Sequence, residues 1–395
     1  MSLQVEFLGM KLKTPFLVGS GPWLSQGSEA QNIVKGLSPY WGGIVTKSYI
    51  HPTGKHPYIT PHLWTTKEFR GRAMQNSGPP CTQLTDEELR GIEVSCKAAH
   101  DEGLVLIASI MGKTEDEWKL MSRQLENAGC DAIELNLSCP STLDSHKGKG
   151  RNIGQIPEQV YDIIRIVKSA TTLPVIPKLT PIVNDIGEIA ASCESAGADA
   201  ITAINTVTGI IGIDVETGIP YSSDKDGRAY VSGISGGAIR PIGLRCVSDI
   251  YKRTDLPIFG VGGIQDWKNV VEYIMVGAPA VQVCTGFMLK GFNIGKRMAN
   301  GLTKFMERKG YESVYDFCGV AHKHLTTTYK ELTVYAVVDE EKCNGCAQCV
   351  PACCESQHIA LSLENKKANV NTERCRGCGL CAVVCKQEAI SFVSR

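Results

Sequence analysis

Cysteines near the end of the chain are the residues whose spacing most directly specifies a chemistry. Nine of the 17 cysteines follow residue 342. Eight of these form two runs with the same C-x2-C-x2-C-x3-C spacing, which is the spacing of bacterial two-cluster ferredoxins. In that arrangement three thiolates bind one cubane and the fourth reaches the other cluster. The spacing therefore predicts two [4Fe–4S] clusters, the first on Cys343, Cys346, Cys349 and Cys385, the second on Cys375, Cys378, Cys381 and Cys353.

A double zinc site and a disulfide scaffold are the alternatives for these cysteines. Zinc sites use two C-x2-C pairs rather than two runs of four, and disulfides are rare in a chain that stays in the cytoplasm. Cys354 stands where ferredoxins usually carry proline, and Lys386 replaces the second such proline. The spacing favours Cys353 over Cys354 as the ligand, and the role of Cys354 stays open.

Composition and charge narrow the class of protein. The chain has 395 residues, of which 43% are hydrophobic and 21% charged, fractions typical of a globular protein rather than a disordered one. Its 41 Lys+Arg balance 41 Asp+Glu, which argues against nucleic acid or an anionic membrane as a partner. No apolar run approaches the roughly 18 residues of a spanning helix, and the N-terminus lacks an apolar signal core. We expect a cytoplasmic protein.

Eight short apolar runs recur between residues 15 and 290, and they are typical of strands buried on both faces. The runs are Phe16–Val18, Ile44–Val45, Val105–Ile107, Ala132–Leu135, Val175–Ile176, Ala200–Ala203, Ile258–Val261 and Ala280–Val283. Amphipathic stretches such as Asp116–Ala128 and Gln159–Ser169 separate them. Alternating strands and helices predict an α/β fold, and eight units of this length predict a (β/α)8 TIM barrel. A doubly wound open sheet is the alternative, but no G-x-G-x-x-G follows the first run.

The predicted organisation has three parts. Residues 1–300 form the barrel, residues 301–335 a helical linker, and residues 336–395 a ferredoxin-like domain with two clusters. The irregular, charged segment Gly209–Tyr230 follows the sixth strand and reads as an active-site or interface loop.

Polar residues follow the apolar strands at the ends where this fold carries its active sites. Lys47-Ser48 ends the second strand, Asn136 the fourth, Lys178 the fifth and Asn205-Thr206 the sixth. Gly262-Gly263 and Thr285-Gly286 follow the last two strands, where barrels of this kind commonly bind a phosphate through backbone N–H groups. The pattern predicts a phosphate-bearing ligand, and the adjoining clusters predict that this ligand is a redox cofactor.

Several motifs resemble those of the dihydroorotate/dihydropyrimidine dehydrogenase superfamily. They are ELNLSCP at 134–140, PKLTP at 177–181, AINT at 203–206, SGGAIRP at 235–241 and GGI at 262–264, in the order of that family. The appended two-cluster module makes the resemblance greatest to the catalytic (PreA-type) FMN and iron–sulfur subunits of bacterial dihydropyrimidine dehydrogenases. The resemblance covers nearly the whole chain.

The resemblance implies an FMN over the barrel mouth. Its phosphate would contact Gly236, Gly262, Gly263, Ile264, Cys284 and Thr285, while Ser20, Lys47, Ser48 and Lys178 would line its rings and ribityl chain. A lysine ammonium beside the ring stabilises the negative charge that reduction places there, which is the role expected of Lys178.

The resemblance also implies the residues that handle substrate. Cys139 would be the general acid that protonates one carbon of a C=C bond while hydride reaches the other, since a thiol with a pKa of roughly 8.5 can serve near neutral pH. It precedes a Gly- and Lys-rich loop that could close over substrate. The substrate contacts implied are Asn76, Asn136, Leu137, Ser138, Asn205 and Thr206. Donors and acceptors of this kind match the edge of a uracil-like ring.

Two positions depart from the family's patterns. Pyrimidine-reducing relatives carry glutamate two residues after the position of Asn76, where this chain has Gly78. Orotate-binding relatives carry asparagine two residues after the catalytic cysteine, where this chain has Ser141. The class of reaction is therefore better defined than the substrate.

The function expected is the FMN-dependent reduction of an activated C=C bond in a uracil- or thymine-like cyclic amide, or the reverse. Because no nicotinamide-binding fingerprint is visible, electrons would come from a separate NAD(P)H-oxidising flavoprotein subunit or a ferredoxin, in a homo- or hetero-oligomer. The alternatives are a dihydroorotate dehydrogenase-type enzyme, a reductase of another cyclic enamide or enone, and an electron-transfer subunit without a substrate of its own.

Overall fold

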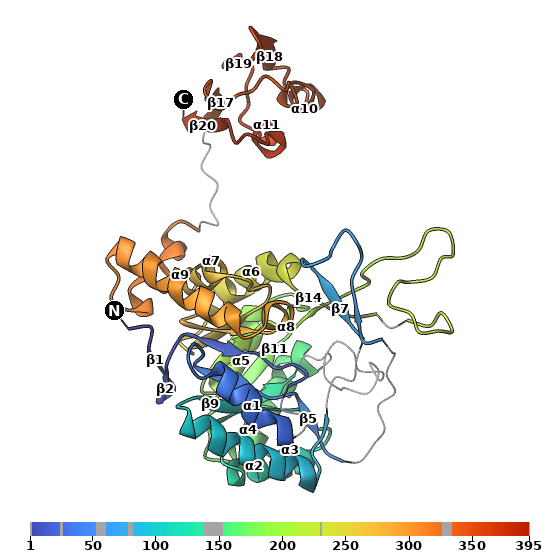
Figure 1. Cartoon of the computed structure of the whole chain (residues 1–395), viewed down its shortest axis with the longest axis vertical. Coiled ribbons are helices and arrows are strands. Elements are labelled where there is room, and N and C mark those ends of the chain that lie inside the picture. Colours follow the sequence, from blue (N-terminus) through green and yellow to red (C-terminus); the bar gives the residue numbers. More distant parts are fainter. Residues whose placement is uncertain are drawn as a thin grey trace. The chain divides into compact units, whose positions relative to one another are not determined.

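The computed structural model describes residues 2–23, 27–52, 61–77, 82–137, 153–229, 231–325 and 334–394 (Figure 1). The chain divides into two compact units, Met1–His324 and Leu325–Arg395. None of the helices within these described ranges is long and apolar enough to cross a membrane.

Eight parallel strands close into a barrel in the first unit. In order around the barrel they are β3 (Phe16–Val18), β4 (Gly43–Val45), β9 (Val105–Ile110), β10 (Ala132–Asn136), β11 (Val175–Leu179), β12 (Ile201–Ala203), β15 (Ile258–Val261) and β16 (Ala280–Val283). The barrel closes because β16 pairs with β3, Val281 lying opposite Phe16. All eight apolar runs form these strands, so the predicted TIM barrel is confirmed and the open-sheet alternative is wrong.

Helices surround the barrel between its strands. They are α1 (Gly27–Leu37), α2 (Asp86–Asp101), α3 (Glu115–Asn127), α4 (Pro157–Lys168), α5 (Ile186–Ser195), α6 (Arg240–Tyr251), α7 (Trp267–Met275), α8 (Thr285–Lys290) and α9 (Asn293–Lys309). Several begin at a capping side chain that accepts a backbone N–H, as Thr85 does for α2 and Asp185 for α5. Helix α9 runs across residue 300 and is followed by the short turns η3 (Val314–Phe317) and η4 (Val320–Lys323).

Short strands outside the barrel complete the first unit. The hairpin of β1 (Val5–Phe7) and β2 (Met10–Leu12) brings the Phe7 ring to 4.0 Å from the Phe259 ring of β15. Two further strands, β5 (Tyr49–Ile50) and β8 (Thr82–Gln83), extend the sheet beside β9. A separate antiparallel sheet has the order β13 (Val207–Gly209), β14 (Ser232–Ser235), β7 (Met74–Asn76) and β6 (Leu63–Trp64).

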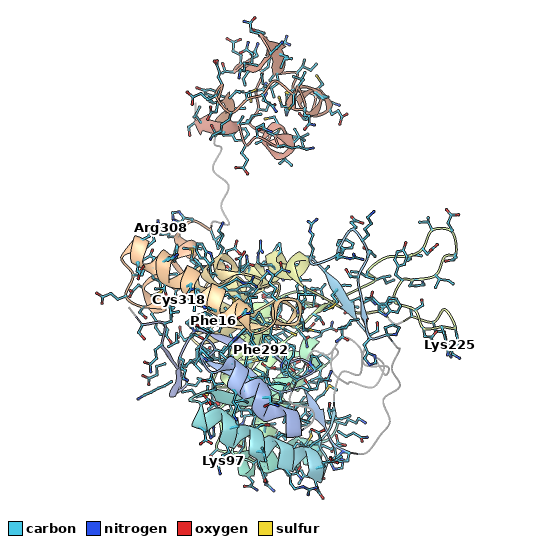
Figure 2. The ribbon with its side chains drawn as sticks, in the orientation of Figure 1. Phe16, Lys97, Lys225, Phe292, Arg308 and Cys318 are labelled. Carbon is cyan, nitrogen blue, oxygen red and sulfur yellow. The ribbon has the colours of Figure 1, made fainter. Side chains whose placement is uncertain are left out.

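The segment between β13 and β14 projects away from the barrel, with Lys225 near its tip (Figure 2). Its backbone pairs with itself through the bridges Ile213–Pro220 and Ser223–Ala229. The segment predicted as an irregular loop is thus an arm rooted in the antiparallel sheet.

The second unit contains two similar halves. The first half comprises β17 (Val334–Val338), α10 (Cys349–Glu355) and β18 (Leu361–Glu364), and the second comprises β19 (Lys367–Val370), α11 (Leu380–Val384) and β20 (Ile390–Ser394). The halves interlock because β17 pairs with β20 and β18 with β19. The ferredoxin-like fold predicted from the repeated cysteine spacing is thus confirmed.

Candidate active site and cysteine clusters

A buried ion pair lies inside the barrel near its carboxyl end. Lys178 Nζ of β11 lies 3.1 Å from Glu134 Oε1 of β10, and both side chains are buried. The Gln282 amide of β16 donates to Glu134 Oε2 at 2.7 Å and accepts from Lys178 Nζ at 3.3 Å. The Thr202 hydroxyl of β12 also donates to Glu134 Oε2, at 3.1 Å. Sequence reasoning singled out Lys178 alone, because the partners come from strands distant along the chain.

A second polar network joins residues expected to contact substrate. The Asn136 amide at the end of β10 donates to Ser48 Oγ at 2.9 Å, and Ser48 shares a 2.8 Å hydrogen bond with Ser109. Asn205 Nδ2 donates to Asn136 Oδ1 at 3.2 Å, and the Thr206 N–H donates to Asn205 Oδ1 at 2.8 Å. The structure therefore brings together polar side chains from the end of β10, from the β4–β5 connection and from the segment after β12.

Glycines shape a cavity of about 490 Å³ at the barrel mouth. Gly236, Gly262 and Gly263 have φ values of +92°, +126° and +71°, which favour glycine. A Cβ on Gly236 would lie 2.8 Å from Arg72 O, and one on Gly286 would lie 2.2 Å from Ile264 O. Glycine is thus required where these turns pack against neighbouring backbone, and the resulting glycine-rich cradle fits a phosphate group.

Most of the residues predicted to bind a cofactor line this cavity. Predicted residues on its wall are Ser20, Lys178, Asn205, Thr206, Gly236, Gly262, Gly263, Ile264, Cys284 and Thr285. They are joined there by Ile204, Ser235, Ile239, Val261, Gln282 and Gly286, which the sequence reasoning did not select as site residues. Thr285 Oγ1 donates to Ser235 Oγ at 2.9 Å and thereby ties the start of α8 to the end of β14.

Tyr273 of α7 supports the glycine turn from below. Its side chain is fully buried, and its hydroxyl lies 2.7 Å from Gly262 O and 3.1 Å from Val261 O. Burial raises the pKa of Tyr273 well above its ordinary value, so the hydroxyl keeps its proton as a donor. By binding the carbonyl side of the turn, Tyr273 fixes how the neighbouring N–H groups are aimed.

The electrostatics near Cys284 show where positive charge gathers. Burial raises the pKa of the Cys284 thiol, and the ammonium groups of Lys178 and Lys47 act in the opposite direction. Cys284 Sγ donates to Ser20 O at 3.3 Å. The ammonium groups of Lys178 and Lys47 therefore both act on this wall of the cavity, with Lys178 paired to Glu134 behind it.

Other predicted site residues lie outside the cavity wall. Ser48, Asn136 and Leu137 are buried, and Lys47 is half-buried. Asn76 belongs to β7 of the antiparallel sheet, where it pairs with Gly233. Ser138 and the predicted acid Cys139 lie outside the described residues, as do Gly78 and Ser141.

In the second unit the eight predicted cysteines surround two hollows. One, of about 310 Å³, is lined by Cys353, Cys375, Cys378 and Cys381. The other, of about 370 Å³, is lined by Cys343, Cys346, Cys349 and Cys385. No three His, Cys, Asp or Glu side chains of the described ranges gather as ligands of a metal ion. The cysteines instead surround cavities, an arrangement that fits a multi-atom cluster better than one ion.

Backbone N–H groups point at several of these sulfurs. Ala360 N lies 3.2 Å from Cys353 Sγ and Ala389 N lies 3.4 Å from Cys385 Sγ. The two halves also exchange contacts, since Ala336 N donates to Cys375 Sγ at 3.4 Å. Such hydrogen bonds stabilise thiolates and tune the potential of a bound cluster. Cys354 is exposed and lines neither hollow.

The barrel, the glycine-lined cavity, the buried lysine and the ferredoxin-like unit are the features against which known families can be compared. The family model described as dihydroorotate dehydrogenase matches residues 2–306, and the model described as 4Fe-4S binding domain matches residues 368–391. The chain belongs to the dihydroorotate dehydrogenase family and carries a 4Fe-4S binding domain, so it is an oxidoreductase acting on CH–CH bonds.

The chain is similar to curated proteins of two kinds. It is 34% identical over 375 residues to the NAD-dependent dihydropyrimidine dehydrogenase subunit PreA of Escherichia coli (strain K12), covering 92% of this chain and 88% of that protein. It is 36% identical to the dihydroorotate dehydrogenase B (NAD(+)) catalytic subunit of Methanothermobacter thermautotrophicus, covering 81% of this chain and 98% of that protein. The corresponding subunit of Pyrococcus furiosus is also 36% identical, with 82% and 100% covered.

Proposed function

We propose that this protein binds FMN at the barrel mouth and reduces the activated C=C bond of a uracil- or thymine-like cyclic amide. Its electrons pass through two [4Fe–4S] clusters. The observation that carries the proposal is one cavity with a glycine cradle and the buried Lys178 in the same wall. Bound FMN supplies hydride transfer to carbon.

The residues that line the cavity suit the two ends of FMN. Backbone N–H groups around Gly236, Gly262 and Gly263 would hold the phosphate, because no side chain keeps a ligand away from that backbone. Lys178 would bind the polar edge of the ring system, where its ammonium favours negative charge. Ser20 and Thr285 would complete the wall between these ends.

The polar network beside the cavity suits a cyclic amide. Asn136, Asn205 and Thr206 present amide and hydroxyl groups that donate and accept, as the alternating N–H and C=O groups of such a ring require. Cys139 follows Asn136 by three residues and is proposed to donate a proton to the carbon that does not receive hydride.

The electron path is part of the proposal. Two cysteine hollows, each with four sulfurs, support two clusters rather than one. The donor would be a separate NAD(P)H-oxidising flavoprotein subunit or a ferredoxin. The similarity to a protein described as a subunit supports the first of these.

An anaerobic titration tests this function. The purified protein is reduced with dithionite, freed of excess reductant, and titrated with uracil, thymine and orotate while the flavin band near 450 nm is followed. Reoxidation by uracil or thymine that is lost in Cys139→Ala supports the proposal. The half-buried Cys318 offers a matched control, and Cys318→Ala should reoxidise like the native protein.

A second candidate is oxidation of dihydroorotate. It is favoured by the 36% identity to dihydroorotate dehydrogenase B catalytic subunits over nearly their whole length. Reoxidation by orotate alone would select it. Reoxidation by none of the three compounds would redirect the search to other cyclic enamides and enones. Turnover unchanged in Cys139→Ala would indicate a relay subunit instead.

A further inference from the structure

A fully buried carboxylate lies beneath the cofactor cavity, in the interior of the barrel. Glu134 is 0% exposed, and its carboxylate is contacted by Lys178, Gln282 and Thr202. All three contacts reach it as donors, the arrangement of a carboxylate rather than of a carboxylic acid. A buried charge of this kind is costly unless it is paired and hydrogen-bonded.

We propose that Glu134 is a positioning residue that holds Lys178 in the cavity wall and limits how strongly its positive charge favours the reduced cofactor. The inference rests on the proposed function, since it concerns the FMN that the cavity is proposed to bind. It assigns Glu134 no contact with substrate or cofactor.

The geometry for this role comes from barrel closure. Glu134 and Asn136 are two residues apart on β10, so their side chains face the same side of the sheet. Asn136 lies opposite Lys178 in the neighbouring strand β11. Lys178 in turn lies opposite Thr202 in β12. Gln282 reaches the pair from β16 and contacts both members, at 2.7 Å from Glu134 Oε2 and 3.3 Å from Lys178 Nζ.

These contacts fix the direction of the lysine chain. Lys178 has four rotatable bonds, but its Nζ is held by Glu134 Oε1 and Gln282 Oε1 while the side chain lines the cavity. The described residues that line the cavity do not include Glu134. The positive member of the pair is therefore the one presented to a ligand, and the negative member stands behind it.

The sign of the electrostatic effect follows from this order. Reduction adds negative charge to the flavin ring, so Lys178 binds the reduced form more tightly than the oxidised form. Glu134 opposes that preference because its negative charge lies in the same weakly screened interior. Removing the charge of Glu134 while keeping its shape should raise the reduction potential of the bound FMN.

The test compares Glu134→Gln with Thr202→Val in the full-length holoprotein. Thr202→Val removes a hydrogen bond from the same carboxylate without changing charge. The midpoint potential of bound FMN is measured anaerobically against reference dyes, together with FMN content and the unfolding midpoint. Glu134→Gln should favour the reduced form about tenfold, or about 30 mV upward for a two-electron couple. Thr202→Val should change this ratio by less than about threefold.

A double variant keeps the test decisive if Glu134→Gln is recovered unfolded because the Lys178 ammonium has lost the charge of Glu134. Lys178→Met with Glu134→Gln removes both charges, an exchange that buried pairs often tolerate. Its potential should fall below that of the native protein, because the ammonium is the member presented to the cavity. An equal or higher potential would overturn the inference.

The outcomes separate the inference from the proposed function. A native protein that neither contains nor binds FMN overturns the proposed function. FMN bound normally with a potential unmoved or lowered in Glu134→Gln overturns only the role of Glu134. Equal shifts in Glu134→Gln and Thr202→Val would mean that the network acts through packing rather than charge, and would also overturn it.

Discussion

Replacing Gly263 by alanine should weaken FMN binding in addition to straining the fold. Gly263 has φ +71°, where an L side chain costs about 1–2 kcal/mol. Its Cβ would also lie 2.7 Å from Arg240 Cβ and 2.9 Å from Gly236 O. Neither Arg240 Cβ nor Gly236 O can move without moving its own backbone. The turn after β15 must therefore shift away from Gly236. That movement separates two parts of the phosphate cradle.

The expected loss can be set against a matched control. Misplacing one N–H that binds a charged phosphate should cost about 1.5–3 kcal/mol, or about 10- to 150-fold in Kd. Gly197 has φ +85° but open space around a Cβ, so Gly197→Ala carries the same backbone strain without the collision. Gly197→Ala should lose about 1–2 kcal/mol of stability and retain native FMN affinity.

The assay is titration of FMN into deflavinated protein, followed by flavin fluorescence, with urea unfolding of each variant measured in parallel. A Kd for Gly263→Ala within about threefold of the native value would refute the placement of the phosphate beside Gly263. Equal affinity losses in the two variants would show that strain alone weakens binding.

Three further outcomes are expected. Cys353→Ala should lose the iron and absorbance of one cluster whereas Cys354→Ala keeps both, as measured by iron analysis, because only Cys353 lines a hollow and accepts an N–H. Tyr273→Phe should weaken FMN binding about 5- to 10-fold by calorimetry, because the Gly262 carbonyl loses its donor. Cys284 should react with iodoacetamide more slowly than a free cysteine from pH 6 to 9, and faster as pH rises, because its raised pKa lowers the thiolate fraction. A mass-spectrometric rate equal to that of free cysteine would contradict this.

Much of the fold could be read from the chain because the relevant signals are local. A strand buried on both faces must be a continuous apolar run, and the eight runs found in the sequence are the eight barrel strands. The antiparallel sheet was missed, since its members Leu63–Trp64, Met74–Asn76, Val207–Gly209 and Ser232–Ser235 are short and mostly half-buried. Segments this short carry no periodicity.

The site was predictable to the extent that its parts are local too. Cysteine spacing predicted the two sets of four, and the glycine-bearing turns Gly262-Gly263 and Thr285-Gly286 after the last two strands predicted the cradle, because both signals depend on neighbours along the chain. Roles that the family resemblance suggested for Asn76 and Cys139 remain predictions.

The surroundings of Lys178 depend instead on contacts between strands that lie far apart in the sequence. Glu134, Lys178 and Gln282 are separated by long stretches of sequence, and nothing local indicates that they meet. They meet because β16 returns to β3 and closes the barrel, which turns alternate side chains of distant strands toward one interior. The order of residues along the chain thus predicted the candidate site, whereas closure of the sheet placed the charge of Glu134 beside Lys178.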